Sequence, residues 1–330
     1  MAHSTASSVF DRFEIKHVTY KTVGDTPIEA SILIPKALKS QTGKPTPVAI
    51  RWHGGFLVTG HRLLADWYPK FILDLCLERN AIAVTVDYRL MPEANGAEIL
   101  EDVRDFYAWL STPGNLARQL PDGIEADLDN LLVTGESAGG YIAFMSATLG
   151  LPAIKAVVMH YPMLDLRADH YTKAYKKHIF DPPVPQIPAH VLSKHIAGLT
   201  GHEVVASDIS VARIPLAMSM VQQGRTDEFL GKERSLYPLE ILEDGTISNQ
   251  PPLWILHGKQ DTAVPVEGTH RFLDLLREKV PRAKVHATFE DGEHGFDNHA
   301  PVTEEAATLN TAWVKEGVRF VDEYWLINAL

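Results

Sequence analysis

Cysteine is nearly absent from this sequence of 330 residues, which holds Cys76 as its single thiol. One cysteine cannot form a disulfide within its own chain, so nothing in the fold depends on an oxidising compartment, and we expect a cytoplasmic protein. Apolar residues around Cys76 recur at helical spacing, which places the thiol on the buried face of a helix. We therefore interpret Cys76 as a small core residue rather than as a catalytic thiol.

The sequence also lacks a long apolar run and an excess of basic residues. No stretch approaches the roughly 20 apolar residues of a transmembrane helix, and residues 1–17 do not resemble a secretory signal, which begins with basic residues and continues with an apolar run. Lys and Arg number 31 against 42 Asp and Glu, so the net charge is −11. Because nucleic-acid binding needs clustered basic residues, we do not expect nucleic acid as a partner, and the lack of a long apolar run predicts no membrane span.

Short apolar segments do recur along the chain. Residues 13–20 and 28–35 alternate in polarity around a turn, which predicts an antiparallel hairpin. Six apolar runs follow, most of them separated by segments of helical period, at 48–52, 81–86, 131–134, 156–159, 253–256 and 285–289. Buried strands that alternate with helices are typical of a mostly parallel sheet with helices on both faces. The sequence therefore predicts a single α/β domain over residues 1–330.

The spacing between two of these predicted strands is unusually wide. About ninety residues separate 156–159 from 253–256, although structureless loops of that length are uncommon inside compact domains. We therefore expect an inserted helical cap over residues 163–250. Its apolar side chains could line a cavity and set substrate specificity, and we expect about half of them to do so. These residues are Phe180, Val184, Ile187, Leu192 and Ile196.

A serine stands in a turn between a predicted strand and a predicted helix. The sequence Gly135-Glu136-Ser137-Ala138-Gly139-Gly140 follows the run 131–134 and fits the pattern G-x-S-x-G. Small residues allow the strand and the helix to approach closely, and the sharp turn exposes the hydroxyl at the sheet edge. The pattern predicts that Ser137 is a nucleophile.

A serine hydroxyl needs an imidazole to accept its proton and an acid to orient that imidazole. Asp261 follows the predicted strand 253–256, and His294 follows the strand 285–289, so both would reach the same sheet edge as Ser137. His299 is an alternative base, and Asp165, after the strand 156–159, is an alternative acid.

Two further acidic residues lie very close to His294 in sequence. We interpret Asp291 and Asp297 as solvated loop residues rather than as the acid of the site.

Acyl chemistry also needs hydrogen-bond donors for a developing oxyanion. The loop His53-Gly54-Gly55-Phe56 follows the first apolar run and offers unobstructed amides. We expect the amides of Ala138 and Gly55 as donors, with Gly54 or Phe56 as the third. His53 is interpreted as a structural residue of this loop.

Five motifs in this order resemble the hormone-sensitive-lipase-like branch of the α/β-hydrolases. They are HGGF at 53–56, DYRLMPE at 87–93, GESAGG at 135–140, HGKQD at 257–261 and HGF at 294–296. The resemblance implies an α/β-hydrolase fold, a triad of Ser137, Asp261 and His294, and a cap over the active site. It also implies that the charges of the segment 87–90, Asp87 and Arg89, are buried ion-pair partners rather than catalysts. Phe56 stands where the family usually has a third glycine, and the two-glycine form resembles arylformamidase-like relatives.

The leading hypothesis is a cofactor-independent serine hydrolase that acts on a small-molecule ester or lactone. An alternative keeps the triad but resolves the acyl-enzyme by acyl transfer or lactone formation. A third hypothesis is a non-catalytic receptor for a small ligand, and the presence of all three triad residues argues against it. No metal or cofactor motif occurs in the sequence, and a homodimer is compatible with it.

Overall fold

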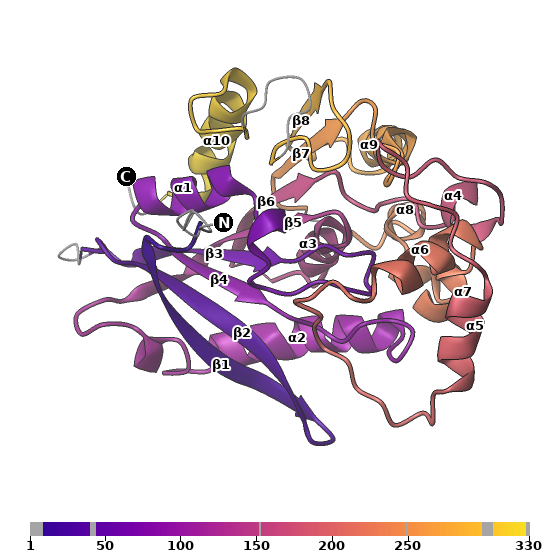
Figure 1. Ribbon diagram of the computed structural model, residues 1–330. Helices are drawn as coiled ribbons and strands as arrows, with labels where there is room; N and C mark the ends of the chain where they lie inside the picture. Colours follow the sequence, from indigo (N-terminus) through magenta and orange to yellow (C-terminus); the bar gives the residue numbers. More distant parts are fainter. Residues whose placement is uncertain (1–8, 40–43, 152, 248–249, 299–305, 328–330) are drawn as a thin grey trace, which may run out of the picture.

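The computed structural model describes residues 9–39, 44–151, 153–247, 250–298 and 306–327. Its centre is one sheet of eight strands in the order β1-β2-β4-β3-β5-β6-β7-β8 (Figure 1). β1 pairs with β2, and β2 with β4, in antiparallel fashion, whereas all other neighbours are parallel. The mostly parallel α/β sheet predicted from the sequence is confirmed.

Each predicted strand is present; most bounds extend the apolar runs by a few residues, whereas β4 begins one residue later than its run. The strands are β1 Phe13–Val23, β2 Thr26–Pro35, β3 Thr46–Trp52, β4 Ile82–Val86, β5 Ala126–Glu136, β6 Ile154–His160, β7 Leu253–Gly258 and β8 Val285–Glu290. The predicted hairpin is β1 with β2, which pair from Phe13 opposite Pro35 to Val23 opposite Thr26.

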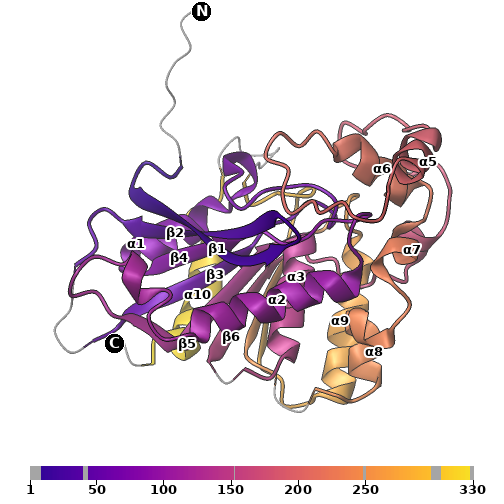
Figure 2. The same cartoon turned by 90° about the horizontal axis from the view of Figure 1, so that it is seen from below.

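The helices cover both faces of the sheet. They are α1 Lys70–Glu78, α2 Gly96–Ser111, α3 Ala138–Thr148, α4 Asp169–Thr172, α5 His190–Ala197, α6 Ile214–Gln222, α7 Thr226–Leu230, α8 Pro238–Glu243, α9 Val266–Lys279 and α10 Ala312–Trp325. Three short 3-10 helices are η1 Ala65–Trp67, η2 Ala117–Gln119 and η3 Arg234–Leu236. The apolar stripes of α1 and α10 pack on one face, and those of α2, α3, α8 and α9 pack on the other. Figure 2 shows α2 and α10 on opposite sides of the strands.

Local sequence explains where α2 begins. The Asn95 side chain accepts a hydrogen bond from the Glu98 amide at 3.0 Å, and the Glu98 carboxylate accepts one from the Asn95 amide at 2.8 Å. This reciprocal arrangement satisfies two amides that have no intrahelical acceptor.

Cys76 lies buried in α1, and burial raises the pKa of its thiol to about 12. The interpretation of Cys76 as a core residue agrees with this position.

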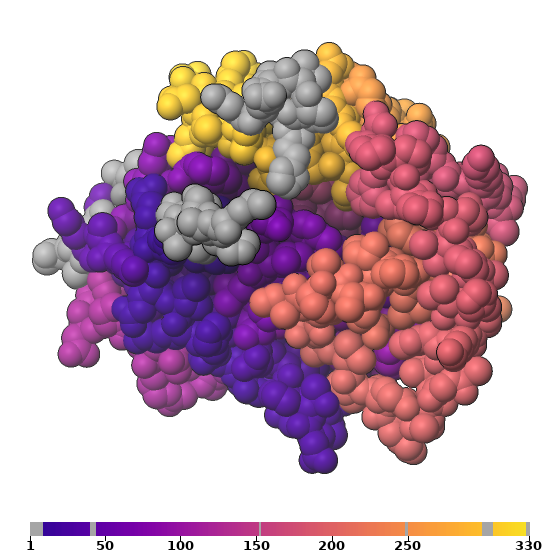
Figure 3. All heavy atoms as spheres, viewed as in Figure 1, coloured from indigo at the N-terminus to yellow at the C-terminus, as the bar shows by residue number. Residues whose placement is uncertain are grey.

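The chain between β6 and β7 contains helices α4 to α8. Figures 1 and 2 place α5, α6 and α7 beyond one end of the sheet, and Figure 3 shows this segment, pink to orange, against the earlier part of the chain. Backbone hydrogen bonds hold it there: the Asp208 amide donates to Gly60 at 2.6 Å, and the Leu90 amide donates to Val205 at 2.7 Å. The helical content predicted for this segment is present in α4 to α8.

Candidate active site

Ser137 occupies the sharp turn between β5 and α3. Its backbone has φ +58° and ψ −117°, and the residue is 4% exposed. The turn brings α3 so close to β3 that a Cβ at Gly139 would lie 2.0 Å from the Trp52 carbonyl oxygen. Only a glycine fits at such a distance, which explains the small residues of the G-x-S-x-G pattern.

Asp261 and His294 meet at the same sheet edge. Asp261 follows β7, His294 follows β8, and His294 Nδ1 lies 2.7 Å from Asp261 Oδ2. The other oxygen of Asp261 accepts hydrogen bonds from the amides of Ala263 at 3.0 Å and Val264 at 2.8 Å. His257 Nε2 lies 3.2 Å from Asp261 Oδ2. The carboxylate is thus held from several sides, and one of its oxygens faces His294.

The electrostatic surroundings keep Asp261 ionised. Burial by itself would raise the pKa of this carboxyl group, but the charge interactions and hydrogen bonds with His294 and His257 outweigh burial. The pKa of Asp261 therefore lies well below its usual range, and the carboxylate carries its charge at neutral and mildly acidic pH.

The alternative acid, Asp165, has a different partner from Asp261. Asp165 forms its ion pair with Arg271, at the start of the second turn of α9. His299, the alternative base, lies outside the described residues. Among the candidates that the structure describes, Asp261 is the one that contacts His294.

The loop after β3 lies beside the serine turn. Gly54, Gly55 and Phe56 line the same cavity as Ser137. Gly55 has φ +113°, and a Cβ there would lie 2.0 Å from the Thr59 carbonyl oxygen, so only glycine allows this path. The amide of Ala138 is in the first turn of α3, where amides have no intrahelical acceptor.

Glu136 links this loop to the serine turn. The sequence analysis did not predict this role of Glu136. The Gly54 amide donates to Glu136 Oε1 at 3.0 Å, and Arg51 Nε donates to Glu136 Oε2 at 3.2 Å. Because this hydrogen bond engages Gly54, the amide of Phe56 is the better candidate for a third oxyanion donor. Burial raises the pKa of Glu136, while Arg51 and the Gly54 amide act in the opposite direction.

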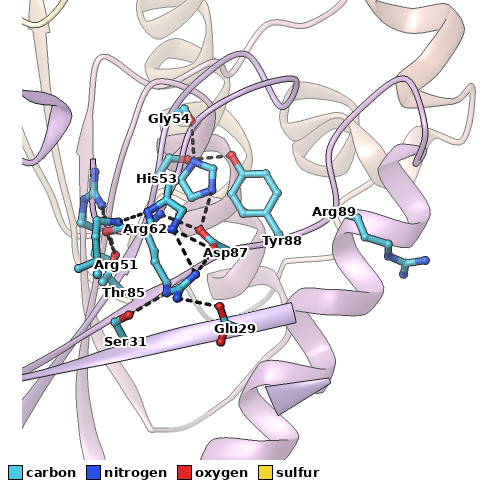
Figure 4. A network of polar contacts seen from close by, with 12 residues as sticks. Glu29, Ser31, Arg51, His53, Gly54, Arg62, Thr85, Asp87, Tyr88 and Arg89 are labelled. Atoms are coloured by element: carbon cyan, nitrogen blue, oxygen red, sulfur yellow. Dashed lines mark hydrogen bonds and ion pairs between the residues drawn. The ribbon is translucent and has the colours of Figure 1, made fainter. Parts of the chain in front are cut away.

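His53 is a structural residue of the loop, as predicted (Figure 4). Its Nδ1 lies 2.7 Å from the Gly54 carbonyl oxygen, and its ring stacks on Tyr88 with centroids 4.4 Å apart. Burial lowers the pKa of His53 to about 3, so the ring is neutral. Arg62 forms an ion pair with Asp87 beneath it.

The other charge of the segment 87–90 is also paired. Arg89 points away from this cluster in Figure 4 and contacts Asp102, whose carboxylate is buried. The prediction that the charges of this segment form buried ion pairs is confirmed at Asp87 and Arg89.

Ser137 and His294 both line a cavity of about 460 Å³. Its walls are mostly aromatic or apolar, and several of these residues had no signal in the sequence. The lining residues are Gly54, Gly55, Phe56, Asp66, Trp67, Glu136, Ser137, Tyr161, Phe180, Ile214, His294, Gly295 and Asn298. Trp67 and Tyr161 come from the segments after β3 and β6.

Phe180 is the one residue of the five predicted in the 163–250 segment that lines this cavity. Leu192 is fully buried in the hydrophobic core, and Val184, Ile187 and Ile196 pack against that core. The expectation that about half of them would face the cavity was therefore too high, because most of these side chains pack against the core.

The interpretation of Asp297 as a solvated loop residue was wrong. Asp297 is 0% exposed, accepts a hydrogen bond from Tyr161 at 3.0 Å and lies 2.7 Å from His160 Nδ1. A carboxylate buried to this extent needs such partners, and both come from the end of β6, far away in sequence. Asp291, by contrast, is exposed as expected, with Lys259 Nζ at 3.2 Å.

The described part of the chain contains no group of three or more His, Cys, Asp or Glu side chains that could hold a metal ion. In the same residues, no helix is both long enough and apolar enough to cross a bilayer.

Comparison with known proteins places this chain in a family. A family model described as α/β-hydrolase fold matches residues 49–296. The chain is 32% identical over 328 residues to a probable carboxylesterase, M8, of Phoma sp., and the match covers 97% of this chain and 98% of that protein. It is 28% identical over 304 residues to the non-reducing polyketide synthase Preu6 of Preussia isomera, covering 82% of this chain but 13% of the synthase.

Solved structures show the same fold. A structure from a study of two fungal esterases of Rhizomucor miehei superimposes with a TM-score of 0.63 at 21% identity, covering 96% of this chain and 84% of that one. The family match spans most of the chain, and the M8 match covers nearly all of it. The chain therefore belongs to the α/β-hydrolase fold family, in its hormone-sensitive-lipase-like branch.

Proposed function

We propose that this protein is a serine esterase that hydrolyses a carboxylic ester or lactone of a small organic molecule. The observation that carries the proposal is the contact of 2.7 Å between His294 Nδ1 and Asp261 Oδ2 at a cavity that Ser137 also lines. The relative from Phoma sp. is named a probable carboxylesterase, which supports the same reaction class.

The proposed mechanism uses Ser137, Asp261 and His294 as a triad. With Nδ1 held by Asp261, the Nε2 of His294 accepts the hydroxyl proton of Ser137 as the serine oxygen attacks the substrate carbonyl. The amides of Gly55 and Ala138, with Phe56 as a third donor, stabilise the oxyanion. The protonated imidazole then gives its proton to the leaving alcohol. Water hydrolyses the acyl-enzyme by the same route and regenerates the serine.

Labelling and turnover by the purified protein test this proposal. A fluorophosphonate should modify the protein with a stoichiometry of one, and a panel of aryl esters, alkyl esters and lactones should show hydrolysis that the label abolishes. A folded protein that neither reacts with the probe nor turns over any ester would contradict the proposal and favour a small-ligand receptor.

Acyl transfer or lactone formation is the second candidate function for the same triad. It is favoured by the similarity of 82% of this chain to part of a protein named as a non-reducing polyketide synthase. Product analysis in the presence of alcohols or hydroxy-esters separates the two reactions. Free acid as the main product supports the esterase, whereas a new ester or lactone supports the transferase.

The pH dependence of hydrolysis should reflect one group on its acid side. The pKa of Asp261 is held below its usual range, so this carboxylate stays charged at mildly acidic pH and adds no step of its own to the acid side of the profile, which the general base alone then sets. We expect log kcat/KM to decline by one unit per pH unit as the pH falls below neutrality, which is the slope for the uptake of one proton. A slope of two would mean that a second group titrates and would contradict the assignment.

We also propose that residues 163–250 form a cap that determines specificity. Phe180 lines the cavity, and its ring centroid lies 5.9 Å from that of His294. Phe180→Ala should enlarge the cavity and raise kcat/KM for bulky esters relative to small ones by about tenfold. Val184→Ala, in the same segment but outside the cavity lining, is the matched control. Equal substrate ranking in wild type and both variants would contradict a role of the segment in specificity.

A further inference from the structure

A second imidazole and carboxylate pair lies behind the proposed triad. His160, the last residue of β6, and Asp297 are both fully buried, with His160 Nδ1 2.7 Å from Asp297 Oδ2. The other ring nitrogen of His160 lies 3.2 Å from the Thr134 hydroxyl oxygen. The proposed hydrolytic mechanism uses neither residue, although burying such polar groups costs free energy unless every one is partnered.

Tyr161 connects this pair to the cavity. Its hydroxyl donates to Asp297 Oδ1 at 3.0 Å, and its ring meets that of His294 edge-on, with centroids 4.5 Å apart. Its backbone has φ +36°, a region that side chains larger than glycine rarely occupy. Burial and the nearby Asp297 carboxylate raise the pKa of Tyr161 well above its usual value, so the hydroxyl remains a donor.

The cluster links two segments that must keep a fixed separation. The Ser137 amide donates to the His160 carbonyl oxygen at 2.8 Å, which fixes the serine turn to the end of β6. Asp297 stands three positions after His294 on the loop that follows β8. The hydrogen bonds from Tyr161 and His160 to Asp297 therefore fix the His294 loop to that same strand end.

We propose that Tyr161 and Asp297 are positioning residues, which hold the His294 ring in register with Ser137 through the Tyr161 to Asp297 hydrogen bond. The inference rests on the proposed function, because it assigns His294 the role of the base. Neither residue exchanges a proton with the substrate. Their effect is on the fraction of time that His294 occupies the productive orientation, so they act on kcat more than on KM.

Tyr161→Phe is the most direct test, because it keeps the ring beside His294 and removes only the hydroxyl. We expect kcat to fall about tenfold or more, KM to change less than twofold, and the rate of fluorophosphonate labelling to fall in parallel with kcat. Tyr237→Phe is the matched control, since that buried tyrosine donates its hydroxyl to the Gly231 carbonyl oxygen away from the cavity. The Tyr237→Phe variant should lose about as much thermal stability as Tyr161→Phe, while its kcat stays unchanged.

Asp297→Asn and the double variant complete the test. If the two residues act through one hydrogen bond, the kcat of the double variant should match that of the more impaired single variant rather than show the product of both losses. Multiplicative losses, an effect on KM alone, or an unchanged kcat in Tyr161→Phe would each overturn the inference. A wild-type protein that resists labelling would instead overturn the proposed function, so the two failures are distinguishable.

Discussion

Replacement of Ser137 by alanine is expected to abolish both ester hydrolysis and fluorophosphonate labelling. Without the hydroxyl no acyl-enzyme forms, and kcat should fall by about a millionfold, to the residual rate that binding and the oxyanion donors provide. Alanine keeps the Cβ of serine, so the turn with φ +58° should form as before and the protein should fold. Steady-state kinetics, labelling and a thermal melt together measure the effect.

Ser146→Ala is the control for this variant. Ser146 lies buried in α3, the helix that follows Ser137, and its hydroxyl donates to the Ile142 carbonyl oxygen at 2.9 Å. Its replacement should leave labelling intact. If Ser137→Ala retained labelling while Ser146→Ala lost it, the nucleophile would have been assigned to the wrong residue.

Asp261→Asn should lower kcat about ten-thousandfold while the protein remains folded. The amide oxygen of asparagine can still accept the hydrogen bonds from Ala263 and Val264. Its amino group, however, would face His294 Nδ1 and force the ring proton onto Nε2, where it blocks acceptance of the serine proton. Kinetics with an activated aryl ester, combined with circular dichroism, would separate this tautomer effect from unfolding.

Asp165→Asn is the matched variant that decides which of the two candidate acids, Asp261 or Asp165, supports catalysis. Asp165 pairs with Arg271, whose side chain is about half exposed, so its loss should cost little activity. A large loss of kcat in Asp165→Asn, with near-normal activity in Asp261→Asn, would reverse the assignment of the acid.

Local sequence patterns were sufficient to predict the sheet and the proposed triad. The strands from β3 to β8 are short apolar runs, because both faces of a parallel sheet are buried, whereas the β1–β2 hairpin shows alternating polarity. Ser137, Asp261 and His294 each stand just after such a run, and parallel strands end at one edge. The His294 to Asp261 contact follows from strand order, which places β7 beside β8.

The cavity walls and the buried polar links could not be predicted in this way. Asp297 was misassigned because its partners, His160 and Tyr161, are more than 130 residues away in sequence. A carboxylate in a glycine-containing loop has the same local pattern whether it is solvated or buried. Trp67 is the last residue of η1 and Ile214 is the first residue of α6, and the positions of these short helices depend on tertiary packing rather than on periodicity.

The link from Arg51 through Glu136 to the Gly54 amide has a consequence for engineering this enzyme. A loop grafted at residues 53–56 from a three-glycine relative would lie beside the Glu136 carboxylate of this chain. The amide of its first glycine would have to donate to that carboxylate, as the Gly54 amide does. A Cβ at position 54 would lie 2.9 Å from the Glu136 carbonyl oxygen, so libraries that randomise the loop alone would sample mostly sequences whose residue 54 crowds the serine turn and displaces its amide from the Glu136 carboxylate. Chimaeras that exchange residues 51–56 together with 135–137 would preserve the hydrogen bonds of Glu136 with Arg51 and the Gly54 amide. Substrate scope could then be varied through other parts of the chain.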